Sequence, residues 1–170
     1  MEHEKQIPIR VSGISEGHHR LEFDVPPAAV DLPEGYGDTL HIDVDVDKST
    51  EQVLVSVTAH ADAAFDCDRC LKPLQFPVDA SFVLVYSSDP EDFDDDDSDD
   101  VRAIDPDDSF VDIGGDVKDY MLLSLPMKIV CEAFGESIEE CDAVVEKFQN
   151  RGDDDDSSDP RWDKLKDLNL

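Results

Sequence analysis

All four cysteines of this chain fall into two pairs, Cys67/Cys70 and Cys131/Cys141. Two residues separate Cys67 from Cys70, the spacing at which a turn directs two thiolates at one point, and a second pair from elsewhere in the chain can complete a tetrahedral zinc site. Nine residues separate Cys131 from Cys141, and Cys141 lies on the apolar stripe of a predicted helix. The spacing therefore leaves two interpretations of this second pair open, metal ligands or small buried core thiols.

Thiol redox chemistry is a third interpretation, carried by Cys67 and Cys70. A redox-active pair needs an electropositive setting, such as a helix N-terminus, that lowers the pKa of the attacking thiol. Here the pair lies between predicted strands, and we expect Asp66 and Asp68 to raise that pKa, with Arg69 opposing them only in part. The sequence favours a structural role over a redox role.

Other signatures of catalysis are missing from the sequence. The five histidines accompany no nucleophile motif, and there is no phosphate-binding glycine loop and no basic, aromatic strip of the kind that binds RNA. Asp43-Val-Asp45-Val-Asp47 opens like a calcium loop, but Lys48 and Leu54 stand where such a loop needs glycine and glutamate. We therefore predict that the protein is not an enzyme and takes no small-molecule substrate. The alternative is a thiol- or metal-dependent enzyme that uses the four cysteines.

The charge is strongly acidic. In 170 residues there are 44 Asp and Glu against 14 Lys and Arg, a formal net charge of −30. Such a surface repels nucleic acid at low ionic strength, and it is typical of a salt-adapted cell interior, where the Debye length is short. The N-terminus carries no secretory signal, and the longest apolar stretch, at 120–130, is too short to span a bilayer. We expect a cytoplasmic protein without membrane association, whose cysteines form no disulfide framework.

Apolar residues at every second position predict strands through the first half of the chain. The alternating segments are 7–11, 21–25, 40–46, 53–65 and 76–86, and 12–19 and 26–37 are predicted connections. Strands of this kind bury one face and expose the other, as antiparallel sheets and open barrels do.

Helical signals follow a short strand predicted at 110–113. Gly114-Gly115-Asp116 opens a helix that runs through Leu125 and is ended by Pro126, because the residue before proline disfavours the α region. Ser137-Ile-Glu-Glu140 is a capping box that opens a second helix to about Asn150. Its predicted apolar stripe consists of Ile138, Cys141, Val145 and Phe148. The fold class is α+β, with an antiparallel sheet or open barrel in the N-terminal two-thirds and helices after it.

The domain organisation follows from two acidic tracts. We predict one α+β domain over residues 1–150, which contains an acidic, disordered loop at 88–103. Residues 151–170 are predicted to be an acidic linker and an amphipathic C-terminal tail, with Trp162, Leu165 and Leu168 as its docking face.

The ordered motifs resemble the YceD family of bacterial and plastid proteins. They are Cys67-x2-Cys70-Leu-x-Pro73-Leu, the β segment and acidic loop after it, the strand Val111-Asp-Ile113, Leu125-Pro126 followed by Cys131, and the closing Asp159-Pro-Arg-Trp162. The resemblance implies a role in the accumulation of large-subunit ribosomal RNA. It also implies one structural zinc ion held by Cys67, Cys70, Cys131 and Cys141, of which Cys141 departs most from the spacing in the family.

The resemblance and the charge together suggest a class of partner. A family role in ribosome biogenesis implies binding to large-subunit ribosomal RNA or to a basic ribosomal protein. Lys and Arg supply most of the affinity for RNA, and this chain has few of them, so the acidic surface favours the protein partner.

Overall fold

The structure, a computed structural model, describes residues 7–88, 101–105 and 107–149 of the chain. It divides into two units, each discontinuous in sequence. The sheet unit comprises Met1–Phe65 and Pro73–Lys128, and the cysteine unit comprises Asp66–Lys72 and Ile129–Leu170. The predicted tail at 151–170 lies outside the described residues, so the domain boundary drawn near residue 150 stays a prediction.

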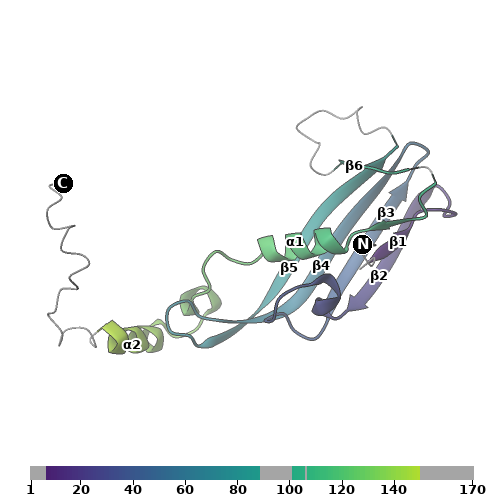
Figure 1. Cartoon of the computed structure of the whole chain (residues 1–170). Helices are drawn as coiled ribbons and strands as arrows, with labels where there is room; N and C mark the ends of the chain where they lie inside the picture. Colours follow the sequence, from purple (N-terminus) through teal and green to yellow (C-terminus); the bar gives the residue numbers. More distant parts are fainter. Residues whose placement is uncertain (1–6, 89–100, 106, 150–170) are drawn as a thin grey trace, which may run out of the picture. The chain divides into compact units, whose positions relative to one another are not determined.

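Five strands form the main sheet of the sheet unit in the order β2-β3-β4-β5-β6 (Figure 1). The strands are β2 (Gly17–Val25), β3 (Leu40–Lys48), β4 (Gln52–Asp66), β5 (Pro73–Ser87) and β6 (Val101–Ala103). β3 is antiparallel to both β2 and β4. The sheet is not closed, so the α+β prediction is confirmed in its open form.

A second, two-stranded sheet pairs the first strand of the sheet unit with the strand that precedes helix α1 (Gly114–Leu123). β1 (Pro8–Arg10) runs antiparallel to β7 (Phe110–Asp112), with Ile9 opposite Val111. The Asp112 carboxylate accepts the Ile7 N–H at 2.8 Å and the Gly114 N–H at 3.1 Å, so it links β1 to the start of helix α1. A short 3-10 helix, η1 (Pro27–Val30), lies in the predicted connection between β2 and β3.

The core of the sheet unit lies on one face of the main sheet. Strict alternation buries every second residue of β5 from Leu74 to Tyr86 and every second residue of β3 from Leu40 to Val46. Helix α1 adds Val117 and Met121, and the Tyr36 hydroxyl donates a hydrogen bond of 3.0 Å to the Met121 carbonyl. The opposite face of β2, β3, β4 and β5 carries the exposed alternate residues, and we call it the outer face.

Several local predictions need correction. β2 begins at Gly17, so His18 and His19 lie in a strand and not in the predicted turn, because they continue the alternation of β2 opposite Asp47 and Val46. Helix α1 ends at Leu123, two residues before the predicted Leu125. Val101–Ala103, placed in the acidic loop predicted at 88–103, form β6, which runs parallel to β5. Residues 89–100 of that loop lie outside the described residues.

None of the described helices is long and apolar enough to cross a membrane.

Candidate metal centre

A tight turn between β4 and β5 positions Cys67 and Cys70. The Cys67 N–H donates to the Lys72 carbonyl at 2.8 Å, and the Leu71 N–H donates to the Cys67 carbonyl at 2.9 Å. Leu71 has a φ of 62°, in the left-handed region that a leucine adopts only at an energetic cost. The surrounding hydrogen bonds must hold this conformation, and it closes the turn immediately after Cys70.

The second half of the site is a short 3-10 helix followed by an α-helix. Cys131 opens η4 (Cys131–Phe134), and Gly135, with a φ of 74°, ends it in the conformation that glycine adopts without strain. Ser137 then caps α2 (Ile138–Gln149), because its hydroxyl accepts the Glu140 N–H at 3.3 Å. This hydrogen bond is the serine half of the predicted capping box. It places Cys141 in the first turn of α2.

Asp68 joins the two segments by a reciprocal pair of hydrogen bonds. Its N–H donates to the Ile129 carbonyl at 2.7 Å, and its carboxylate accepts the Ile129 N–H at 2.8 Å. These bonds pair the backbone of the turn with the chain that enters η4. Sequence reasoning assigned Asp68 only an electrostatic effect on the thiols, since nothing in the local sequence indicates a partner 61 residues away.

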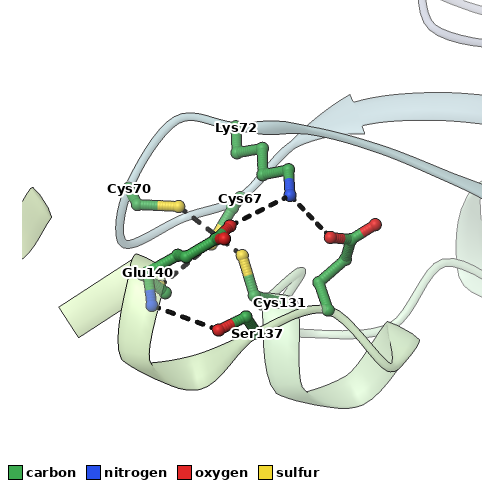
Figure 2. A network of polar contacts seen from close by, with 8 residues as sticks. Cys67, Cys70, Lys72, Cys131, Ser137 and Glu140 are labelled. Carbon is green, nitrogen blue, oxygen red and sulfur yellow. Dashed lines mark hydrogen bonds and ion pairs between the residues drawn. The ribbon is translucent and has the colours of Figure 1, made fainter. Parts of the chain in front are cut away.

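Two exposed cations add ion pairs between the same segments. Arg69 pairs with Asp142 of α2 at 2.6 Å. Lys72 pairs with Glu136 at 2.6 Å and approaches Glu140 at 3.8 Å (Figure 2). All of these side chains are solvent-accessible, so the pairs fix geometry more than they add stability.

The four cysteine sulfur atoms converge in the space between the turn and the second segment. They all lie within 4.8 Å of one another. The Sγ atoms of Cys70 and Cys131 are 3.5 Å apart, and those of Cys67 and Cys141 are 4.0 Å apart. Four sulfurs bound to one zinc at ~2.3 Å lie roughly 3.8 Å from each other in a tetrahedron. The observed separations therefore fit a tetrahedral ion, and Cys141 belongs to the cluster rather than to a separate apolar core.

Backbone N–H groups lower the pKa of the Cys67 thiol. Burial raises the pKa of Cys67, but hydrogen bonds from the N–H groups of Cys70, Arg69 and Cys131 outweigh it and lower the pKa to about 6. We expected the neighbouring aspartates to raise it, and that expectation is wrong, because oriented amides close to the sulfur dominate. Burial is also the largest cause of the raised pKa values of Cys131, at about 12, and of Cys141. The Cys67 thiol is 0% exposed, which suits a metal ligand better than a nucleophile.

The described part of the cysteine unit, residues 66–72 and 129–149, has almost no apolar core apart from these thiols. Among its described residues only Cys67, Cys131 and Cys141 are buried. The apolar stripe predicted on α2 is buried only in part: Cys141 is buried and Val145 is half-buried, whereas Ile138 is 44% exposed and Phe148 is 63% exposed. A unit that buries so little apolar surface needs another source of stability, and small metal-binding modules obtain it from the ion.

The donor set fits a structural metal ion. Four cysteine ligands fill a tetrahedral coordination sphere, whereas catalytic zinc sites keep a position open for water or substrate. If zinc is bound, Cys67, Cys70, Cys131 and Cys141 would hold it. These are the four residues that the sequence analysis selected; the structure brings their sulfur atoms together, and their role as ligands stays a prediction.

Fold and site together define a class of protein: a small α+β protein with an open sheet and a four-cysteine cluster able to hold a metal ion. The model of the family described as "Large ribosomal RNA subunit accumulation protein YceD" matches residues 55–169. The chain belongs to the YceD family. No curated protein and no solved structure matches the chain.

Proposed function

We propose that the protein is a non-enzymatic, cytoplasmic factor in the biogenesis of the large ribosomal subunit, which binds a basic ribosomal protein during assembly. Membership of a family named for large-subunit RNA accumulation supports the ribosomal role. The observation that carries the non-enzymatic role is the cysteine cluster, whose four ligands leave no position for a substrate. The enzyme alternative has no support in the described residues beyond the cysteines themselves.

The proposed zinc ion folds the cysteine unit and takes no part in chemistry. It would join the turn after β4 to the start of α2, two segments that are more than 60 residues apart in sequence. Because ligand residues must come together for the ion to bind, the binding free energy of structural zinc contributes directly to folding.

The charge of the outer face supports a basic protein as the partner. Within β2 to β5, Arg20 is the single Lys or Arg on this face. Within the sheet unit, the acidic residues of the outer face are Glu22, Asp24, Asp43, Asp45, Asp47, Asp62 and Asp79. A surface of negative potential speeds the encounter with a positively charged protein and repels the negatively charged backbone of RNA. The partner is therefore proposed to be protein, and bound RNA is the competing outcome.

Affinity purification after chemical cross-linking tests the proposal. The tagged full chain is expected to recover basic large-subunit ribosomal proteins, and nuclease treatment is expected to leave that recovery unchanged. Recovery that disappears with nuclease would mean that RNA is the direct partner. Recovery of neither ribosomal protein nor large-subunit RNA would refute the ribosomal role.

Two matched variants separate a specific contact from general acidity. Neutralising three β3 aspartates is expected to reduce recovery several-fold, while an equal change of charge in the cysteine unit leaves it intact. The first variant replaces Asp43, Asp45 and Asp47 with asparagine. The second replaces Glu132, Glu139 and Glu146, all exposed, with glutamine.

A further inference from the structure

A row of four polar side chains crosses the outer face of the main sheet, in the sheet unit and apart from the cysteines. Asp24 on β2 is the register partner of His41 on β3, and His41 is the register partner of His60 on β4. His60 in turn contacts Asp79 on β5. The two imidazoles thus lie side by side on adjacent strands, with one carboxylate at each end of the row.

The carboxylates fix the tautomer of both imidazoles. Nδ1 of His41 lies 2.5 Å from Oδ1 of Asp24, and Nδ1 of His60 lies 2.7 Å from Oδ1 of Asp79. An ionised carboxylate only accepts hydrogen bonds, so each Nδ1 carries the proton and donates it. In a neutral imidazole the lone pair then lies on Nε2. A carboxylate that holds the other ring nitrogen in this way is the arrangement found behind metal-binding histidines.

The two rings lie close enough to share one ion. Their centroids are 6.4 Å apart and their planes differ by 25°. Zinc bound ~2 Å from each ring nitrogen would place two such centroids roughly 5–6 Å apart. The His41 side chain is 57% exposed and that of His60 is 44% exposed, so neither is locked by packing and a small rotation closes the difference.

The surroundings select a cation of a particular type. His41 and His60 line a hollow of about 410 Å³ together with Asp38 and Asp62. Its carboxylates disfavour anions, and imidazole ligands favour zinc, nickel or copper over calcium or magnesium, which prefer oxygen. We propose that His41 and His60 form a second metal site, which binds one imidazole-preferring divalent cation and links β3 to β4. Water or the carboxylates of the hollow complete the coordination.

Nickel titration of the full chain loaded with one equivalent of zinc, which the cysteine cluster takes up first, tests this site. Ni²⁺ is the probe because imidazole suits it and because zinc already fills the cysteine cluster. Calorimetry at ~1 M salt suppresses diffuse attraction to the acidic surface, since the Debye length is then only about 3 Å. One Ni²⁺ per chain is expected to bind, and His41→Gln or His60→Gln is expected to weaken binding at least tenfold.

Matched controls distinguish coordination from charge. His19→Gln removes a histidine of β2 whose ring contacts the Ser15 carbonyl, and it is expected to leave nickel binding unchanged. Asp24→Asn is expected to weaken binding about tenfold by loosening His41. Asp45→Asn removes the same charge from the same face without contacting either ring, and it is expected to have less than a twofold effect.

Nuclear magnetic resonance gives a second reading that does not depend on variants. Paramagnetic Ni²⁺ is expected to broaden the ring signals of His41 and His60 before those of His18 and His19. The proposal is overturned by the absence of nickel binding, by equal binding in His41→Gln and the parent protein, by equal losses in Asp45→Asn and Asp24→Asn, or by uniform broadening of all four rings.

Discussion

Removal of the metal is expected to unfold the cysteine unit while the sheet unit stays folded. Among the described residues of the cysteine unit only three cysteines are buried, so apolar burial cannot replace the ion. Structural zinc contributes roughly 10–16 kcal/mol at neutral pH. That amount matches or exceeds the roughly 5–15 kcal/mol that stabilises a whole domain. The unit therefore has no folded state to occupy once the ion is lost.

The expected loss of α-helical circular dichroism follows from the lengths of the helices. Of the two α-helices in the described residues, α2 has 12 residues and belongs to the cysteine unit, and α1 has 10 and belongs to the sheet unit. Chelation under reducing conditions, or Cys131→Ser, is expected to remove about half of the α-helical circular dichroism. Hydrogen exchange is expected to become fast at the amides of α2 and to stay slow at those of β3 and β4, which lie in the middle of the main sheet.

Glu132→Gln is the matched control, since Glu132 adjoins Cys131 but is exposed. It is expected to keep both the helical signal and the metal. Full helical signal and slow exchange at α2 after complete removal of the metal would refute the reasoning. So would collapse of the sheet unit at the same chelator concentration.

Three further predictions concern single groups. In the metal-free, reduced protein no thiol is expected to titrate near pH 6 by ultraviolet absorbance, because the unfolded cysteine unit no longer holds the N–H groups of Cys70, Arg69 and Cys131 against Cys67; a thiolate that titrates near pH 6 would show that the unit stays folded without the ion. Tyr36→Phe is expected to lower the free energy of unfolding in urea by about 1–2 kcal/mol, because it leaves the buried Met121 carbonyl without its donor. Tyr86→Phe is expected to be neutral or stabilising, because the buried Tyr86 hydroxyl has no partner in the described structure. Equal losses of stability in the two variants would contradict this reasoning. Lys72→Gln is expected to shift the urea midpoint of the zinc-loaded protein less than Tyr36→Phe does, because its ion pairs are exposed, and a larger shift would show that these pairs stabilise the fold.

The strands were predictable because their signal is local. Alternation with a period of two marks β3, β4 and β5 directly in the sequence, and it also fixes which of their residues form the core. Pairing between distant segments carries no such signal. The strands β1 and β7 were predicted, at 7–11 and 110–113, but their pairing with each other was not. The parallel strand β6 was missed altogether, because its three residues adjoin the acidic loop and show too little alternation to be recognised.

The site was predictable in its ligand candidates but not in its construction. All four cysteines were candidates because thiols are few and distinctive, although the spacing of Cys131 and Cys141 left buried core thiols open as an alternative. The pair of hydrogen bonds between Asp68 and Ile129 joins segments 61 residues apart, and the lowered pKa of Cys67 depends on how the N–H groups of its own turn and of Cys131 are oriented; spacing reveals neither. The periodic stripe of α2 identified Cys141 as buried, but periodicity alone does not fix how deeply each member is buried, and Ile138 and Phe148 are largely exposed among the described residues.

X-ray absorption at the zinc edge, together with the metal content of the purified reduced protein, tests the central claim most directly. The account predicts one zinc per chain, lost in Cys67→Ser/Cys70→Ser, with four sulfur ligands at ~2.3 Å. Absence of zinc, or a zinc ion bound by nitrogen and oxygen with fewer than four sulfurs, would contradict the assignment of Cys67, Cys70, Cys131 and Cys141 as a closed structural site.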